Sequence, residues 1–263
     1  MRNKFTLLIS IYLMPFYGCD LIQAPIVNIE MTRSGFHRDL LYSVQFDYPL
    51  AGKDCEYVLE QLLPAAVYVS VDEMNDLKRL KKFNAVYPKF VDIEITTEKA
   101  QPLSVLLKGT PKITDSIKLP IHFRYHTPRE DGSFVDVDIS NPNIYMRCPD
   151  DEDDLSDTEL KVNPNVNYCL NEDLCSFTES SENPATADDC VWKRINANIQ
   201  LKSPLTAKIP VGNEKAFPPI LYATILVSWV VSLYTVLKTH HVPEHINQRL
   251  EEQRIQQNKL KTN

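Results

Sequence analysis

Residues 220–237 read ILYATILVSWVVSLYTVL, and this stretch divides the chain into two parts of different character. It contains no charged side chain, follows Pro218 and Pro219, and ends at Lys238. At a rise of ~1.5 Å per residue, a helix of this length covers roughly 27 Å, close to the hydrocarbon thickness of a thin bilayer. Leu and β-branched residues cover every face, which favours a lipid-facing helix over a core helix. The sequence therefore predicts one transmembrane helix over residues 218–237.

The segments on the two sides of this helix differ in charge. Residues 238–263 hold five Lys or Arg and three Glu, whereas residues 25–217 hold 21 basic and 31 acidic side chains. Lys and Arg are enriched on the cytosolic side of membrane helices. We therefore expect residues 238–263 to be a cytosolic tail and residues 25–217 to be a lumenal or extracellular domain. A glycolipid-anchor signal is excluded, because its apolar stretch would end the chain.

The N-terminus carries a second apolar stretch. Arg2 and Lys4 precede the uncharged run FTLLISIYLM at residues 5–14. A basic start followed by an apolar run of this length is typical of a secretory signal peptide and is too short to span a bilayer. We expect residues 1–24 to be the signal peptide, with an undetermined cleavage position; the alternative is a buried N-terminal strand. The signal and the charge bias predict the same topology.

The chain ends in KLKTN, which places Lys259 and Lys261 at the fifth and third positions from the C-terminus. Lysines at these positions of a cytosolic tail resemble the dilysine retrieval signal of endoplasmic-reticulum membrane proteins, an address read by a receptor. Together with the expected topology, they predict residence in the endoplasmic reticulum membrane. The alternative is a chance spacing in a polar, helical tail.

Small polar residues recur inside the expected membrane helix. Thr224, Ser228 and Ser232 are spaced by four residues and therefore follow one helix face. Small residues allow another membrane helix to approach closely, and their hydroxyls can form hydrogen bonds across the contact. We expect this stripe to face a membrane partner; the alternative is that the hydroxyls bond back to their own helix.

The composition argues against several classes of protein. The 263 residues carry a formal net charge of −7, whereas a nucleic-acid-binding protein normally has a basic patch. There are only 6 glycines, and the chain has neither the glycine-rich nucleotide-binding motifs nor the GxSxG elbow of serine hydrolases. Nucleotide-binding and serine-hydrolase functions therefore lack their strongest signatures.

The region before the membrane helix consists mostly of short segments in which apolar and polar residues alternate. Turns containing Pro, Gly and Asp separate them, a pattern typical of an all-β sandwich. One helix is expected over residues 71–83, where Asp72 could cap it and apolar residues recur at helical spacing. The fold class is therefore mainly β: a lumenal β-sandwich with one short helix, plus a single C-terminal transmembrane helix. The expected strands cover residues 26–31, 41–48, 90–96, 103–108, 117–125, 134–139, 144–147, 195–202 and 207–211.

Four of the 6 cysteines, Cys148, Cys169, Cys175 and Cys190, crowd into residues 148–190. This stretch is poor in apolar residues and contains the run DDEDDLSDTE at 150–159, so we expect an acidic, solvated insertion. In an oxidising lumen, the four cysteines should form two disulfides, with three connectivities open. Cys55 would then be a buried thiol, unless Cys19 survives signal cleavage and pairs with it.

Residues 119–128 read LPIHFRYHTP, in which basic and apolar side chains alternate. On a strand, His122, Arg124 and His126 share one face. Two histidines at this spacing on a strand are too far apart to chelate one ion easily, and the arginine between them repels a cation. We therefore expect a partner-facing or hydrogen-bonded strand face rather than a metal site.

Asp136 and Asp138 reproduce the DxD pattern of some sugar-nucleotide transferases. The alternating Val135, Val137 and Ile139 explain the two aspartates as an exposed strand face. Such a transferase also needs a nucleotide-binding α/β domain, which the pattern of short strands does not provide. The chain also has no CxxC pair, EF-hand spacing or Asn-x-Ser/Thr sequon. We expect no catalytic residue, cofactor or metal ion.

Two segments resemble a known family. LPIHFRYHTP at 119–128 is similar to a signature of the PIG-X/Pbn1 family, the class X proteins of phosphatidylinositol-glycan biosynthesis and their fungal relatives. LPAAVYVSVDEM at 63–74 resembles a second segment of that family. The likeness extends over the lumenal domain and includes the late membrane helix, but it is weak over 148–190.

This resemblance implies a non-catalytic role. Proteins of this family stabilise the first mannosyltransferase of glycosylphosphatidylinositol (GPI) anchor synthesis. That partner, the class M (PIG-M-like) catalytic subunit, is multi-spanning and adds the first mannose on the lumenal side from dolichol-phosphate-mannose. Two other functions remain open. One is a cell-surface adhesion or receptor ectodomain, and the other is a lumenal hydrolase with a pocket at His122 or Asp138.

Overall fold

The computed structural model describes residues 23–47, 51, 54–82, 84–148, 160–163, 165–180 and 190–261, without the side chains of 240–245. Nearly all of the expected signal peptide and the acidic run at 150–159 lie outside the described residues. The chain forms two compact units. The first comprises Met1–His126 and Val135–Ile209, and the second comprises Thr127–Phe134 and Pro210–Asn263.

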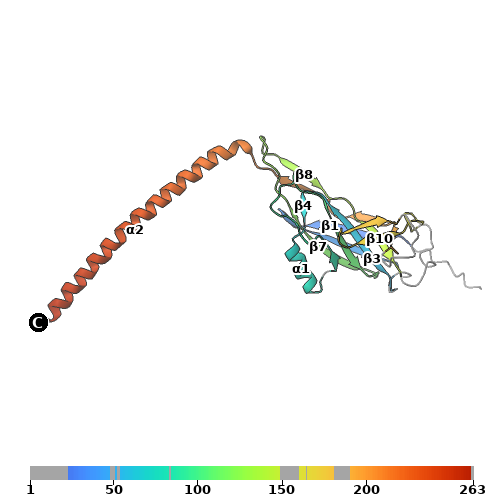
Figure 1. Cartoon of the computed structure of the whole chain (residues 1–263), viewed down its shortest axis with the longest axis horizontal. Helices are drawn as coiled ribbons and strands as arrows, with labels where there is room; N and C mark the ends of the chain where they lie inside the picture. Colours follow the sequence, from blue (N-terminus) through green and yellow to red (C-terminus); the bar gives the residue numbers. More distant parts are fainter. Residues whose placement is uncertain are drawn as a thin grey trace, which may run out of the picture. The chain divides into compact units, whose positions relative to one another are not determined.

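The first unit contains a five-stranded sheet in the order β13-β1-β2-β7-β4. Figure 1 labels β1, β7 and β4 of this sheet. β1 buries every second side chain over its first half, where Val27 and Ile29 have no exposed surface. This period-two burial is what the alternating sequence predicts. The strands are β1 (Ile26–Thr32), β2 (His37–Gln45), β4 (Val67–Tyr68), β7 (Asp115–Phe123) and β13 (Asn198–Leu201).

A second five-stranded sheet has the order β12-β9-β3-β6-β5. One of its faces packs on the main core, and the other carries a smaller apolar cluster that includes Val58, Leu106 and Trp192. The hairpin of β10 (Tyr168–Asn171) and β11 (Ser176–Glu179) contributes Tyr168 to this cluster. The strands of the second sheet are β3 (Glu56–Leu63), β5 (Ala85–Val86), β6 (Leu103–Gly109), β9 (Asn143–Arg147) and β12 (Lys193–Ile195).

One apolar core joins the two sheets. It contains Leu40 and Leu119 from the first sheet and Leu59 and Leu107 from the second, all with no exposed surface. Two further strands, β8 (Phe134–Asp138) and β14 (Thr206–Pro210), form a separate two-stranded sheet. The prediction of a mainly β chain with one short helix and a C-terminal apolar helix is therefore confirmed.

Two expected strands differ from the structure. Residues 90–96 form a bent loop rather than a strand, and Phe90 and Ile93 are exposed instead of facing the core. Residues 195–202 form two strands, β12 and β13, which belong to different sheets because the chain crosses between the sheets after Ile195. The strands β3, β4, β5, β10 and β11 were not expected from the sequence.

The short helix α1 spans Val71–Arg79 and is shorter than expected. Its N-cap is Ser70, whose hydroxyl accepts a hydrogen bond from the Glu73 backbone N–H, rather than Asp72. Asp72 and Glu73 instead lie in the first turn, where negative charge interacts favourably with the helix dipole. Met74 is the residue that α1 buries in the main core.

The cysteine pairing differs from the prediction. Cys55 bonds to Cys148, and Cys169 bonds to Cys190, whereas Cys175 is a buried free thiol. The expectation that Cys55 is a thiol and that Cys148 and Cys175 both pair within 148–190 is therefore wrong. The reason is strand register: Glu56 of β3 lies opposite Arg147 of β9, so the next residues outward, Cys55 and Cys148, meet at the end of the ladder.

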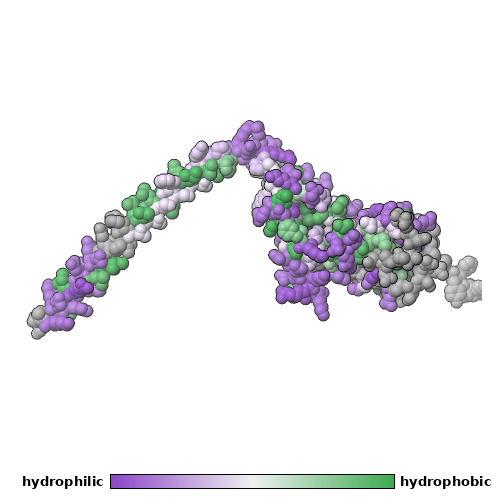
Figure 2. All heavy atoms as spheres, in the orientation of Figure 1, coloured by the Kyte–Doolittle hydropathy of each residue, from purple (hydrophilic) through white to green (hydrophobic). Residues whose placement is uncertain are grey.

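The second unit contains η1 (Glu214–Ala216) and the long helix α2 (Phe217–Lys261). Pro218 and Pro219 lie in the first turn of α2. Backbone N–H groups of the first turn make no hydrogen bond within the helix, so proline, which lacks this group, is tolerated there. Residues Glu214–Thr239 form a segment long and apolar enough to cross a membrane, and an 18-residue window within it has a mean hydropathy of 2.0. Its apolar side chains are exposed, as Figure 2 shows along the first half of the helix.

Candidate functional site

Three rings stack side by side where β7 ends. His122 of β7 lies between its two register partners, His37 of β2 and Tyr68 of β4. The His37 and His122 ring centroids are 4.3 Å apart, and those of Tyr68 and His122 are 5.2 Å apart. Directly opposed residues on neighbouring strands point to the same face of the sheet. The sheet therefore builds a ladder of two imidazoles and a phenol.

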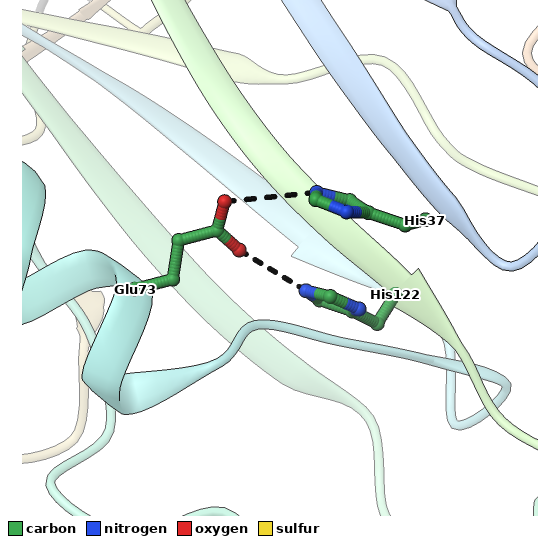
Figure 3. Close-up of side chains that lie close together, drawn as sticks. All are labelled: His37, Glu73 and His122. Atoms are coloured by element: carbon green, nitrogen blue, oxygen red, sulfur yellow. Dashed lines mark hydrogen bonds and ion pairs between the residues drawn. The ribbon is translucent and has the colours of Figure 1, made fainter.

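The first turn of α1 places a carboxylate against this ladder. Glu73 stands three residues after the N-cap Ser70, the position at which a capping-box glutamate turns back to its own helix. Here Glu73 reaches the histidines instead (Figure 3). Its Oε2 is 3.1 Å from His122 Nε2, and its Oε1 is 3.6 Å from His37 Nε2. One carboxylate therefore faces both imidazole Nε2 atoms.

Arg124 is buried within the same domain, with 5 % of its surface exposed. Its guanidinium lies 4.8 Å from the centre of the Tyr68 ring and donates hydrogen bonds to the carbonyl oxygens of Asp92 and Ile95. Burial lowers the pKa of the Arg124 guanidinium and raises that of the Tyr68 hydroxyl. Arg124 therefore anchors the loop around residues 92–95.

His126 is also largely buried, with 9 % of its surface exposed. Its Nδ1 lies 3.3 Å from Glu98 Oε1, and the neighbouring Tyr125 carbonyl accepts a hydrogen bond from the Thr97 backbone N–H. The structure therefore places the three basic residues of LPIHFRYHTP in intramolecular contacts. Of the two interpretations given above for this strand face, the hydrogen-bonded one describes these side chains.

The exposed groups of this region are apolar residues that the sequence analysis did not select. Tyr125 is 71 % exposed and contacts the Phe36 ring, with a centroid separation of 4.7 Å. Phe90 and Ile93, on the loop that Arg124 anchors, are 81 % and 53 % exposed. The sequence carried no signal for Phe90 and Ile93, because residues 90–96 alternate like a strand and their apolar side chains were therefore expected to face the core.

The two aspartates of the DxD pattern lie on the exposed face of β8, whereas Val137 between them is buried. Asp138 Oδ1 accepts a hydrogen bond from the Thr206 hydroxyl. A cavity of about 520 Å³ lies elsewhere in the domain, and its lining includes Lys82, Lys108 and Trp192 but neither His122 nor Asp138. This cavity therefore does not support the hydrolase alternative.

The polar stripe of α2 is bonded within its own helix at two of its three positions. The Thr224 hydroxyl donates to the Leu221 carbonyl, and the Ser228 hydroxyl donates to the Thr224 carbonyl. All three stripe residues are exposed on the isolated chain. Lys259 and Lys261 lie in the last turn of α2.

Comparisons with known proteins agree on one relationship. A family model described as PIG-X / PBN1 matches residues 33–240. A protein of Rattus norvegicus named "GPI alpha-1,4-mannosyltransferase I, stabilizing subunit" is 27 % identical over 225 residues, covering 81 % of this chain and 77 % of its own length. The Homo sapiens protein of the same name is 26 % identical, covering 82 % of this chain and 81 % of its own length. The family match spans most of the chain, including the ladder and the apolar half of α2, and this chain therefore belongs to the PIG-X / PBN1 family.

Proposed function

We propose that this protein is a non-catalytic, stabilising subunit of GPI mannosyltransferase I and that it binds the multi-spanning, PIG-M-like catalytic subunit. The observation that carries the proposal is the similarity over 81–82 % of this chain to relatives named as the stabilising subunit of that enzyme. Among the described residues, one apolar helix is long enough to span a membrane, which is consistent with a partner that lies in the membrane.

The mechanism that we propose is mass action on folding. A partner that binds only the folded enzyme stabilises it by ~2.7 kcal/mol at a concentration a hundredfold above Kd. Membrane enzymes of marginal stability are degraded when they unfold, so a shift of ~1–2 kcal/mol changes their abundance several-fold. This mechanism requires no catalytic residue in the stabilising subunit.

The proposed location is the endoplasmic reticulum membrane, with the β domain in the lumen and residues 238–263 in the cytosol. The charge difference across the apolar stretch supports this orientation, and so do the disulfides Cys55–Cys148 and Cys169–Cys190, which form in oxidising compartments. Replacing Lys259 and Lys261 by serine should move part of the protein to later secretory compartments. Unchanged location of that variant would contradict a retrieval role for these lysines.

We propose that the small-residue stripe of α2 is one contact with the catalytic subunit. Because the Thr224 and Ser228 hydroxyls are satisfied within the helix, close packing rather than hydrogen bonding across the contact should supply its energy. Leucine at positions 224, 228 and 232 should therefore reduce co-purification, whereas alanine at the same positions should preserve it. Equal co-purification of both triple variants would exclude the stripe from the interface.

A second contact is proposed in the lumen. Arg124 and His126 would act there indirectly. Arg124 holds the loop that exposes Phe90 and Ile93, and His126 pairs with Glu98 next to the exposed Tyr125. Exposed aromatic and aliphatic side chains are typical of the centre of an interface. Serine at the three apolar positions should weaken binding more than alanine at Asp136 and Asp138, which share the exposed face of β8.

The decisive experiment measures mannose transfer per molecule of catalytic subunit in membranes with and without this chain. The expected result is a several-fold lower amount of catalytic subunit with unchanged transfer per molecule. Unchanged abundance with abolished transfer per molecule would instead indicate a catalytic or substrate-delivery role.

A further inference from the structure

We propose that His37, Glu73 and His122 form a binding site for one divalent transition-metal ion of the zinc class. The three side chains come from β2, α1 and β7, and one ligand atom from each lies within 4.8 Å of the other two (Figure 3). Two imidazole nitrogens and one carboxylate oxygen are ligands that zinc prefers, and three protein ligands plus water are common in open zinc sites. The inference does not depend on the proposed mannosyltransferase role.

The spacing of the ligand atoms suits such an ion. Bonds of ~2.0–2.1 Å in a tetrahedral site place neighbouring ligand atoms about 3.3 Å apart. Glu73 Oε2 lies 3.1 Å from His122 Nε2, and the other carboxylate oxygen, Oε1, lies 3.6 Å from His37 Nε2. With one ligand atom taken from each residue, all three atoms lie within 4.8 Å of one another, so the side chains must move closer to reach about 3.3 Å around a shared ion.

His37 supplies the second observation. Its Nε2 is buried, lies beyond hydrogen-bond distance of Glu73, and has no hydrogen-bond partner among the described residues. A buried polar atom without a partner is unfavourable, so a ligand for this nitrogen would be a gain. The two imidazole planes differ by only 19°, so one ring must turn about its side-chain bond to aim at a shared ion. The His37 side chain, 39 % exposed, loses no Nε2 hydrogen bond when it turns.

The local charge is also compatible with a cation. Glu73 contributes one negative charge, and the imidazoles bind a metal ion in their neutral form. Arg124, which directly follows β7, is held by the Tyr68 ring and by two loop carbonyls. His122 and Glu73 remain partly exposed, with side-chain accessibilities of 23 % and 35 %. Water can therefore complete the coordination.

A bound ion would join three elements that the chain connects only through loops. It would fix the first turn of α1 against β2 and β7, next to the LPIHFRYHTP segment that positions the exposed Tyr125. We therefore assign the site a structural rather than a catalytic role, and metal binding should raise the melting temperature of the domain by stabilising the folded state.

The test uses the purified full-length chain in detergent, with Co²⁺ and Zn²⁺ as the probes. The sequence also contains His240, His241 and His245, so these three are first replaced by alanine to remove competing ligands. Titration with Co²⁺ should show one equivalent bound per chain, with visible absorption that Zn²⁺ abolishes. The variants His37→Gln, Glu73→Gln and His122→Gln should each bind at least ~10-fold more weakly, because losing even an outer-shell partner costs 10–100-fold.

His126→Gln is the matched control, because His126 also pairs with a glutamate but lies outside the cluster. Its affinity should be unchanged. A second measurement needs no substitution in the cluster: X-ray absorption of the zinc-loaded chain should show two imidazole ligands. Absence of Co²⁺ and Zn²⁺ binding by the folded chain, equal affinity in all four variants, or a zinc spectrum without imidazole would each overturn the proposal.

Discussion

The Tyr42 hydroxyl donates a 2.8 Å hydrogen bond to Gln61 Oε1 in the core between the two five-stranded sheets. Both residues are almost completely inaccessible, with exposures of 1 % and 0 %. The Gln61 amide nitrogen donates to the carbonyl oxygens of Leu62 and Ser140, so the side chain uses its acceptor and both donors. A buried polar group is tolerated in an apolar core when its hydrogen bonds are satisfied. This contact ties β2 of one sheet to β3 of the other.

Tyr42→Phe should lower the free energy of unfolding by ~1–3 kcal/mol, because it leaves the buried Gln61 oxygen without a donor. Chemical or thermal unfolding of the purified chain measures the change. Tyr87→Phe is the control, since the Tyr87 hydroxyl makes a 2.8 Å hydrogen bond to Asn75 at an exposed position. An equal loss of stability in the two variants would contradict a special role for the buried pair.

The burial of Tyr42 also predicts alkaline destabilisation. Burial raises the pKa of Tyr42 above its ordinary value of 10.0, so above pH ~10 the unfolded chain releases a proton that the folded chain retains. The stabilising contribution is therefore complete below pH ~10 and is lost as the pH rises from there, at up to ~1.4 kcal/mol per pH unit. Thermal unfolding between pH 9 and 11 should show a shallower decline in Tyr42→Phe than in the unmodified chain. Parallel declines would refute this assignment.

The disulfides predict unequal effects of cysteine substitution. Cys55–Cys148 closes a separation of 93 residues and Cys169–Cys190 one of 21, so chain entropy predicts a loss of about 4–5 kcal/mol for Cys148→Ser and about 3 kcal/mol for Cys190→Ser. Burial raises the pKa of the Cys175 thiol, which disfavours the reactive thiolate.

Peptide mapping without reduction should therefore find these two cystines, with Cys175 alkylated only after unfolding. Recovery of Cys175 in a cystine would contradict the pairing. Cys175→Ala should leave both cystines intact and serves as the control for the two serine variants.

Arg124→Lys should release the loop at residues 92–95. A lysine ammonium cannot reproduce the planar stacking of the guanidinium on Tyr68 together with hydrogen bonds to the Asp92 and Ile95 carbonyls. Hydrogen exchange should become faster in residues 90–97, while β1 stays protected. Arg129→Lys, in the second unit, is the control and should leave exchange in this loop unchanged. Unaltered exchange in Arg124→Lys would show that the loop keeps its structure without the Arg124 guanidinium contacts.

The sequence by itself determined the parts of the fold whose pattern is local. β1 and β7 have one face on the main core, so their apolar residues alternate and predict strands. The apolar stretch before Lys238 similarly predicts a helix, because its length and lack of charge are local properties. The family resemblance also rested on contiguous segments, 63–74 and 119–128.

Only the tertiary structure determined the conformation of segments whose contacts are made with residues far away in the sequence. β3 buries both faces, one on each apolar cluster, so its sequence EYVLEQLL lacks a clean alternation. Residues 90–96 do alternate, but the loop carbonyls of Asp92 and Ile95 are satisfied by Arg124 instead of a neighbouring strand. The alternation of apolar residues therefore missed the strand β3 and predicted a strand at residues 90–96, where the structure has a loop.

Strand register decided the two remaining features. It placed Cys55 beside Cys148, although four cysteines stand closer together in the sequence. It also placed His37 opposite His122. From the sequence alone, the only histidine considered as a partner of His122 was His126, in the same predicted strand. Cross-strand neighbours lie ~4.5–5.5 Å apart, but residues four apart along a strand are separated by ~13 Å. Pairing between strands is set by packing over the whole domain, so only the folded chain brings these side chains together.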